Sequence, residues 1–326
     1  MHKIFVTRAI TQQAEELLSQ FCEVETWPLL TPPPKGEILR RMGAIDGLLT
    51  MLTDPIDAEV LAAAGQNFKA ISQLAVGYDN IDIAEATRRK IPVGHTPGVL
   101  TETTADMAWA LLMAVARRVV EAHNEVRQGV WRAWGPFVLC GQQVHGATLG
   151  IIGFGRIGQA MARRAAGFDM RVLYHDPKRH PELEEKWGVC YASLDELLAQ
   201  SDFVSLHPYL SDATRNLINA ETLGKMKPSA FLINTARGAM VDQDALYSAL
   251  KEGRLAGAGL DVTTPEPIAA DSPLLGLPNV VITPHIASAA TQTRQEMALI
   301  AAHNLLSALK GERMRYCVNP EAEAAR

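Results

Sequence analysis

Three side chains that could transfer a proton and bind an anion follow apolar stretches of the sequence. Arg237 closes "FLINTAR", Glu266 follows "GLDVTTP" and His285 closes "VITPH". The apolar stretches are typical of buried strands, and α/β proteins bind ligands where the carboxyl ends of parallel strands meet. Taken singly, each residue has an ordinary structural explanation, such as a surface arginine or a turn before a proline. Together they predict one reaction site.

The chemistry that fits these three residue types is hydride reduction of a carbonyl group. Such a reduction needs a proton donor beside the carbonyl oxygen, and an imidazole, whose usual pKa is near 6.5, can supply that proton. A neighbouring carboxylate favours the charged form of the ring and fixes its orientation. Arginine presents planar N–H donors to a substrate carboxylate. The set therefore predicts an enzyme that reduces a carbonyl group in a substrate that also carries a carboxylate.

A glycine motif that could bind a dinucleotide begins almost halfway along the chain. The stretch "GIIGFGRIGQA" contains Gly153, Gly155 and Gly158 as G-x-G-x-x-G, between a strand-like and a helix-like segment. In this arrangement the glycines permit a tight turn, close approach to a pyrophosphate and close helix packing. A second strand-like segment is followed by Asp176, 18 residues after Gly158, near the position of a carboxylate that binds the ribose of NAD. The alternative is a set of turn and packing glycines without a cofactor.

The residues after the second strand decide which nicotinamide cofactor is expected. Asp176 would repel a 2′-phosphate, which favours NAD. Lys178 and Arg179 lie two and three residues further on and could accept such a phosphate, so NADP remains possible.

Two series of alternating strand-like and helix-like segments predict an α/β protein with two doubly wound parallel sheets. The first series occupies about the first hundred residues, and the second runs from 147 to 285. Between them, 101–129 is expected to form one long helix. After the second series, 293–312 is expected to form an amphipathic helix that packs on the first unit, with no strand after it. The nucleotide-binding unit is then inserted between two parts of the first unit.

Composition excludes several classes of function. The chain has 326 residues, 48% of them apolar, a net charge of −5 and a pI near 6.0, which gives no basic surface for nucleic acid. No signal peptide is recognised, and the longest apolar run, 107–116, is too short to span a membrane. The four cysteines are scattered, which is typical of reduced thiols, so we expect a cytoplasmic protein without a metal site.

Six segments together resemble the D-isomer-specific 2-hydroxyacid dehydrogenase family. They are "LAVGYDNID", "TPGVLTETTAD", "GIIGFGRIGQA", "NTARGAMVD", "GLDVTTPEP" and "TPHIAS". Within the family, the segments "PGVLTETTAD", "WRAWGPFVLCG", "DVTTPEPI" and "HIASAATQTR" are most similar to glyoxylate/hydroxypyruvate reductases. The resemblance implies a Rossmann coenzyme domain, 99–286, inserted in a flavodoxin-like substrate-binding domain, 1–98 with 287–326. It also explains why the glycine motif begins so late.

The resemblance implies a role for each matching residue. Arg237 would orient the substrate, His285 would act as acid and base, and Glu266 would be its carboxylate partner. The N–H groups of Val76 and Gly77 would bind the substrate carboxylate. Residues implied to contact the cofactor are Thr104, Gly153, Gly155, Arg156, Ile157, Gly158, Asp176, His207, Pro208, Thr214, Thr235, Ala236, Arg237, Asp261 and His285, with Asp261 on the nicotinamide carboxamide.

The resemblance also implies a homodimer. The helix expected from residue 101 is similar to the family's dimerisation element. The stretch "WRAW", 131–134, is similar to a loop that reaches the partner's substrate site in relatives, although two tryptophans there would equally suit plain interface packing.

Several related activities stay open at this stage. The substrate could be glyoxylate, hydroxypyruvate or, in a 2-ketogluconate reductase, a longer 2-oxoacid. A 3-phosphoglycerate dehydrogenase is an alternative, although the sequence ends soon after residue 310, without that enzyme's common regulatory domain. A binding protein that senses NAD, of the corepressor type, would use the same scaffold, but it would not need the set of Arg237, Glu266 and His285.

Overall fold

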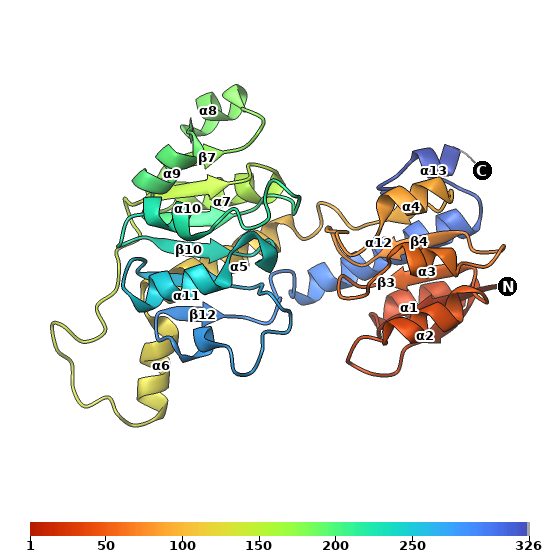
Figure 1. The fold of residues 1–326 in the computed structure, drawn as a ribbon, viewed down its shortest axis with the longest axis horizontal. Helices are drawn as coiled ribbons and strands as arrows, with labels where there is room; N and C mark the ends of the chain where they lie inside the picture. Colours follow the sequence, from red (N-terminus) through yellow and green to blue (C-terminus); the bar gives the residue numbers. More distant parts are fainter. Residues whose placement is uncertain (325–326) are drawn as a thin grey trace. The chain divides into compact units, whose positions relative to one another are not determined.

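The chain folds into two compact units, each with its own parallel sheet (Figure 1). The structure is a computed structural model that describes residues 1–324. Unit 1 combines Met1–Leu100 with the residues from Ala289 on, and unit 2 is the continuous stretch Thr101–Ser288. The expectation of two doubly wound parallel-sheet α/β units is confirmed. The chain passes between units two residues later at each crossing than the sequence analysis placed the domain boundaries.

Unit 1 is built on a five-stranded sheet of order β2-β1-β3-β4-β5, in which all paired strands are parallel. This order is that of flavodoxin-like folds. The strands are β1 His2–Val6, β2 Cys22–Thr26, β3 Gly47–Thr50, β4 Ala70–Gln73 and β5 Val93–Gly94. The helices are α1 Gln12–Ser19, α2 Lys35–Met42, α3 Ala58–Ala62, α4 Ile83–Arg88, α12 Thr291–Leu309 and α13 Glu321–Ala324.

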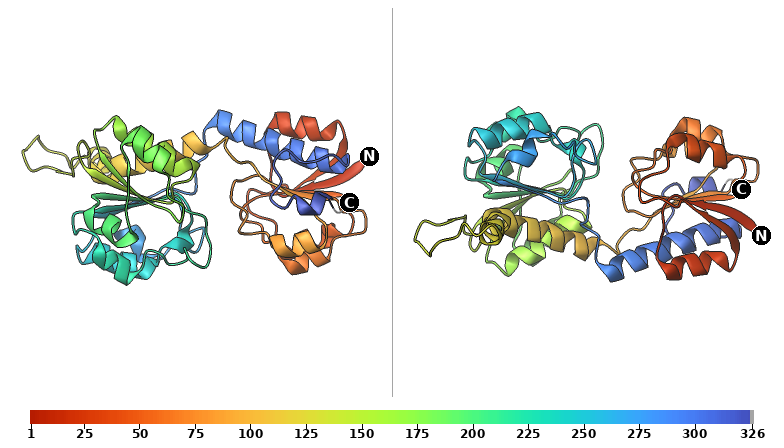
Figure 2. Two further views of the ribbon diagram at one scale, coloured as in Figure 1. Left: turned by 90° about the horizontal axis from the view of Figure 1, so that it is seen from above. Right: turned by 90° about the horizontal axis from the view of Figure 1, so that it is seen from below.

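Helices α1 and α12 cover one face of this sheet, and α2, α3 and α4 cover the other (Figure 2). The residues after 289 are tied to the N-terminal strands by buried polar contacts. The Ser72 hydroxyl on β4 donates to the Ala301 carbonyl on α12 at 2.7 Å. The Asn319 side chain accepts from the N–H of Val93 on β5 at 2.8 Å.

A short extended segment after α12 was not expected from the sequence. Cys317 pairs antiparallel with Gly94, and the N–H of Val318 donates to the Val93 carbonyl at 2.8 Å. The pairing is an isolated bridge and not a strand, so the prediction that no strand follows the C-terminal helix is confirmed for residues 1–324. The segment is too short to show an alternating pattern, and β5 supplies the hydrogen-bond partners that fix it.

Unit 2 is built on a seven-stranded parallel sheet of order β12-β11-β10-β9-β6-β7-β8. The first strand, β6, lies inside the sheet, and the order reverses beside it, as in dinucleotide-binding folds. The strands are β6 Thr148–Ile152, β7 Arg171–His175, β8 Cys190–Tyr191, β9 Phe203–Leu206, β10 Phe231–Asn234, β11 Gly257–Leu260 and β12 Val280–Ile282. The helices are α5 Thr101–Ala116, α6 Val119–Arg127, α7 Arg156–Ala166, α8 Pro181–Trp187, α9 Leu194–Gln200, α10 Ala220–Lys225 and α11 Gln243–Lys251.

Two apolar layers enclose this second sheet. Helices α5 and α7 pack side by side on one face, and α9, α10 and α11 cover the other (Figure 2). The central strands β6, β9, β10 and β11 are buried on both faces, which explains their nearly continuous apolar sequences. The helices cover both faces of the sheet but not the carboxyl ends of its strands. The polar candidate side chains lie at these ends and in the loops that follow them.

The stretch 101–129 does not form the single helix expected from its sequence. Helix α5 ends at Ala116, and α6 begins after Arg118, whose φ of 52° lies in the left-handed region. The N–H of Gln142 donates to the Ala116 carbonyl at 2.8 Å and occupies a group that a continued helix would use. A contact distant in sequence therefore ends α5, and helical periodicity could not reveal it.

Candidate active site

The glycine loop between β6 and α7 needs two of its three glycines for the protein's own packing. Gly153 has a φ of 85°, and a Cβ there would lie 2.5 Å from the nitrogen of Pro208. A Cβ on Gly158 would lie 2.2 Å from the carbonyl oxygen of Gly153. A Cβ on Gly155 would meet nothing within 4 Å. The second glycine therefore has no structural need within the chain and leaves space at the start of α7.

We expect Gly155→Ala to weaken dinucleotide binding without unfolding the protein. The φ of −70° at this residue suits alanine, so the melting temperature should stay near wild type. The methyl group would occupy the space that a pyrophosphate needs, and the Kd for NADH should rise about tenfold or more, equivalent to about 1.4 kcal/mol. Fluorescence titration and thermal unfolding measure the two quantities. An unchanged Kd would place the pyrophosphate elsewhere. Gly158→Ala is the comparison: its methyl group would overlap the Gly153 carbonyl oxygen, so this variant should have a lower melting temperature.

Helix α7 begins with N–H groups that no side chain caps. Its N-cap is Gly155, so the first turn, which includes Arg156 and Ile157, has no capping oxygen. The first N–H groups of a helix lack partners within it and carry a partial positive charge, which suits an anion.

Asp176 follows β7 and holds the glycine loop in place. One carboxylate oxygen accepts from the N–H of Phe154 at 2.7 Å, and the other accepts from the N–H of Lys178 at 2.9 Å. The guanidinium of Arg179 is paired with Glu184, whose carboxylate accepts two hydrogen bonds of 2.8 Å from it. This ion pair holds the pKa of Glu184 down, at about 2.

His207, Pro208 and Thr214 follow β9 on the next loop. Pro208 lies against the glycine loop, as the position of a Cβ on Gly153 shows. The His207 Nε2 lies 2.8 Å from the Ser205 hydroxyl, and burial lowers the pKa of His207 to about 3. The ring therefore stays neutral in the working range of most enzymes. The Thr214 hydroxyl donates to a carbonyl of its own loop at 2.6 Å, which closes that loop.

The turn after β10 carries Thr235, Ala236 and Arg237. Asn234, the last residue of β10, organises it: its side chain accepts from the N–H of Ala236 at 3.0 Å and donates to the Arg237 carbonyl at 2.9 Å. A Cβ on Gly238 would lie 2.1 Å from a backbone oxygen after β11, so the turn packs directly on that loop. The half-buried Arg237 side chain donates to the Ala236 carbonyl at 2.8 Å.

The structure brings His285 and Glu266 together, 19 residues apart in sequence. The His285 Nδ1 is hydrogen-bonded to the Glu266 carboxylate, and about a fifth of the histidine side chain is exposed. Gln243 on α11 anchors the loop before Glu266, because its side-chain carbonyl accepts from the N–H of Thr264 at 2.9 Å. With Nδ1 engaged, Nε2 is the ring nitrogen that remains for a substrate.

Asp261 follows β11 and is almost fully buried, with 1% of its surface exposed. Its carboxylate accepts hydrogen bonds from the segment that carries His285, described below. Thr104 is buried on α5, in the layer that covers β10 and β11.

In unit 1, Val76 and Gly77 lie in the loop after β4. The carbonyl of Val76 lies 3.1 Å from the His95 Nδ1, and the carbonyl of Gly77 accepts from the Gln73 side chain at 3.2 Å. Among residues 1–324, no backbone hydrogen bond starts from the N–H of either residue.

Comparison with known proteins decides the family. Residues 109–287 match the model of the NAD-binding domain of D-isomer specific 2-hydroxyacid dehydrogenases. A glyoxylate reductase of Korarchaeum cryptofilum (strain OPF8) is 52% identical over 325 residues, which cover 99% of this chain and 98% of that protein. The chain belongs to the D-isomer-specific 2-hydroxyacid dehydrogenase family.

Two solved structures agree with this assignment. A protein of Thermus thermophilus is 48% identical to this dehydrogenase, with a TM-score of 0.91, over 97% of this chain and 99% of that one. An NADPH-dependent glyoxylate/hydroxypyruvate reductase of Sinorhizobium meliloti, solved with NADP and malonate, is 31% identical, with a TM-score of 0.87, over 99% and 98% of the two chains. The chain is an NAD(P)-dependent oxidoreductase acting on CH–OH groups.

Three features of this dehydrogenase fit a bound dinucleotide. Gly155 leaves open the space that a side chain would fill. The start of α7 has no capping side chain. The Thr235 hydroxyl is buried and has no hydrogen-bond partner among the described residues. Buried polar atoms are normally paired, so this hydroxyl suits a ligand.

Sequence reasoning missed residues that orient this site. Asn234 was detectable, because an asparagine at the end of an apolar strand stands three residues before Arg237. Gln243 carried no signal, because it reaches the loop before Glu266 from a separate helix. The hydrogen bonds of Asp261 within the chain were missed as well.

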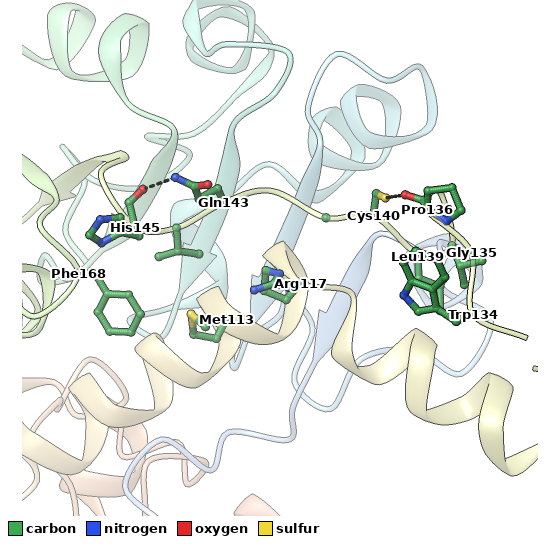
Figure 3. A pocket seen from close by; sticks show the side chains of 13 residues that line it. Met113, Arg117, Trp134, Gly135, Pro136, Leu139, Cys140, Gln143, His145 and Phe168 are labelled. Carbon is green, nitrogen blue, oxygen red and sulfur yellow. Dashed lines mark hydrogen bonds between the residues drawn. The ribbon is translucent and has the colours of Figure 1, made fainter.

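The pocket in Figure 3 is separate from these residues. It measures about 540 Å³ and lies between α5 and the segment 134–145. Its lining includes the polar side chains of Arg117, Cys140, Gln143 and His145. Within residues 1–324, no group of three or more His, Cys, Asp or Glu side chains could hold a metal ion, and no helix is long and apolar enough to cross a membrane.

Proposed function

We propose that this dehydrogenase reduces a small 2-oxoacid, glyoxylate or hydroxypyruvate, to the 2-hydroxyacid with a nicotinamide cofactor. The observation that carries the proposal is the hydrogen bond between His285 and Glu266, at the same sheet edge as the glycine loop. The names of the relatives from Korarchaeum and Sinorhizobium support the substrate class.

In the proposed reaction His285 is the proton donor. When bound, the reduced nicotinamide supplies the hydride to the carbonyl carbon. The Nε2 of protonated His285 gives its proton to the carbonyl oxygen, and the ring returns to its neutral form. Glu266 stabilises the charged ring through Nδ1 and fixes its orientation. The reverse reaction needs the neutral ring as a base.

Substrate binding is assigned to one arginine and to backbone donors. The planar guanidinium of Arg237 binds the carboxylate and carbonyl oxygens of the 2-oxoacid. The N–H groups of Val76 and Gly77 bind the carboxylate.

The cofactor-binding role of the remaining candidates also stays a proposal. They are the glycine loop, Arg156, Ile157, Asp176, His207, Pro208, Thr214, Thr235, Ala236, Asp261 and Thr104. We propose that NAD is preferred over NADP, because Asp176 presents a carboxylate after β7 and Arg179 is already paired with Glu184.

We expect Asp176→Ala to shift cofactor preference toward NADPH. Removing the carboxylate relieves its repulsion of a 2′-phosphate and also removes an acceptor for the ribose hydroxyls. The ratio of kcat/KM for NADPH to that for NADH should rise about tenfold or more, or about 1.4 kcal/mol. Glu252→Ala removes an equal charge from the end of α11 and should leave the ratio unchanged. A wild-type enzyme that strongly prefers NADPH would contradict the role of Asp176.

We expect Glu266→Gln to move the pH profile of kcat/KM for reduction to lower pH. The amide keeps the shape but not the charge that stabilises protonated His285, so reduction loses its acid at lower pH, and oxidation keeps its base to lower pH. Burial lowers the pKa of His207 to about 3, so the His207 ring is neutral over the pH range of the assay. The fall of kcat/KM with rising pH therefore does not come from His207. Profiles in both directions that superimpose on wild type would leave Glu266 only a structural role.

We also propose that the protein is a cytoplasmic homodimer. The segment from α6 to residue 138 exposes apolar side chains, including Trp134 at 83% and Phe137 at 90%, and Figure 2 shows the loop extending from unit 2. Such a patch is typical of an interface. A second copy is the proposed partner, through the element that resembles the family's dimerisation helix. Sedimentation equilibrium of the purified protein tests this proposal.

A panel of 2-oxoacids, followed by nicotinamide absorbance with NADH and with NADPH, tests the substrate. We expect the highest kcat/KM with glyoxylate or hydroxypyruvate. A clear preference for 2-ketogluconate or 3-phosphohydroxypyruvate would assign a different dehydrogenase. Binding of NADH without turnover of any member would favour a sensor of the cofactor.

A further inference from the structure

The buried carboxylate of Asp261 is bonded to the segment that carries His285. Its Oδ1 accepts from the Thr283 hydroxyl at 2.6 Å and from the N–H of Ile286 at 2.9 Å. Its Oδ2 accepts from the N–H of Ala287 at 2.7 Å. The donors come from both sides of His285 in the sequence, so one side chain holds the whole segment 283–287.

The backbone of His285 needs such support. Its φ of 54° lies in the left-handed region, which costs free energy for a residue other than glycine and persists only where the surroundings impose it. The N–H of His285 donates to the Asp261 carbonyl at 2.9 Å. Asp261 therefore fixes this conformation through its backbone and its side chain.

Asp261 can do this because it is itself attached to the sheet. It directly follows β11, and Thr283 directly follows β12. These two strands pair in parallel, with Leu260 opposite Ile282, so the register brings Asp261 and Thr283 together. The N–H of Asp261 also donates to the carbonyl of Asn234 on β10 at 2.9 Å.

We propose that Asp261 is the positioning residue for His285. By fixing segment 283–287, its carboxylate keeps the imidazole against Glu266 and keeps Nε2 directed at the substrate. The inference rests on the proposed function, in which His285 transfers the proton. It is distinct from the contact with the nicotinamide carboxamide that the family resemblance implies, because every hydrogen bond described above lies within the chain.

The test is Asp261→Asn in the full-length protein. An amide nitrogen donates and cannot accept, so at least one of the three hydrogen bonds to segment 283–287 is lost. We expect kcat for reduction to fall by about 10- to 100-fold, the Kd for NADH to change by less than about threefold, and the pH profile to shift in the direction of Glu266→Gln. A wild-type kcat and pH profile would overturn the proposal.

A cofactor analogue separates positioning from binding of the carboxamide. In the 3-acetylpyridine analogue of NADH, the carboxamide NH₂ is replaced by methyl, so an Asp261 contact to that group is absent in both proteins. Positioning predicts the same ratio of wild-type to variant kcat with the analogue as with NADH. A ratio that falls to one with the analogue would trace the whole loss of kcat to the carboxamide contact and overturn the positioning role.

Asp202→Asn is the matched control. Asp202 also anchors a backbone group, because its Oδ2 accepts from the N–H of Thr148 at 2.9 Å, but it lies at the amino ends of β6 and β9. We expect a lower melting temperature with unchanged kcat and pH profile. If Asp261→Asn does not fold, Thr283→Val removes one donor with little change of shape, and the same readouts apply. Failure of the proposed function itself would appear separately, as full activity of His285→Ala.

Discussion

Replacing His285 with alanine is expected to lower kcat/KM for reduction by about 10²–10⁴-fold, the usual range for loss of a general acid. The imidazole is hydrogen-bonded to Glu266 through Nδ1, so Nε2 is the ring nitrogen that can face the substrate. Binding of NADH should change little, because the groups that suit its phosphates lie at the start of α7. Steady-state kinetics and a fluorescence titration measure the two effects.

The control for this result is His303→Ala, which removes an exposed histidine from α12. It should leave both constants at their wild-type values. If His285→Ala retained wild-type kcat/KM, the proton would come from another group. That result would also contradict the roles proposed for Glu266 and Asp261, because both act through His285.

Replacing Arg237 with alanine is expected to lower kcat/KM by about 10- to 150-fold. A hydrogen bond to a charged group contributes about 1.5–3 kcal/mol, and each 1.36 kcal/mol is a factor of ten. Lysine should restore little, because it lacks the planar pair of donors that matches a carboxylate.

Arg254→Ala is the matched control for Arg237→Ala. Arg254 is exposed in the turn before β11, and its guanidinium pairs with Glu252. Its loss should leave kcat/KM unchanged. Kinetics of Arg237→Ala that match those of Arg254→Ala would remove Arg237 from the substrate site.

The sequence predicted the site best where a polar residue directly follows an apolar strand. The apolar stretches before Arg237 and His285 are strands of one parallel sheet, so simple topology places both residues at the same edge. The pairing of His285 with Glu266 followed from the same reasoning. These predictions need only the position of each strand end.

What the sequence did not reveal depends on contacts between distant segments. The break after Ala116 is caused by Gln142, and the helical pattern of 101–129 carries no trace of it. The attachment of Asp261 to Ile286 and Ala287 uses backbone N–H groups, which every residue except proline has and no pattern marks.

The discontinuity of unit 1 also governs the order in which the chain can fold during synthesis. Unit 2 is one uninterrupted stretch, so its sheet has all its strands once residue 282 has left the ribosome. The first strands of unit 1 are made earliest, yet β4 must wait for Ala301 and β5 for Asn319. Contacts that span more than 220 residues close a long loop and form slowly. The part of the chain that is translated first is therefore the last to be completed, and its apolar strands stay exposed to other proteins in the meantime.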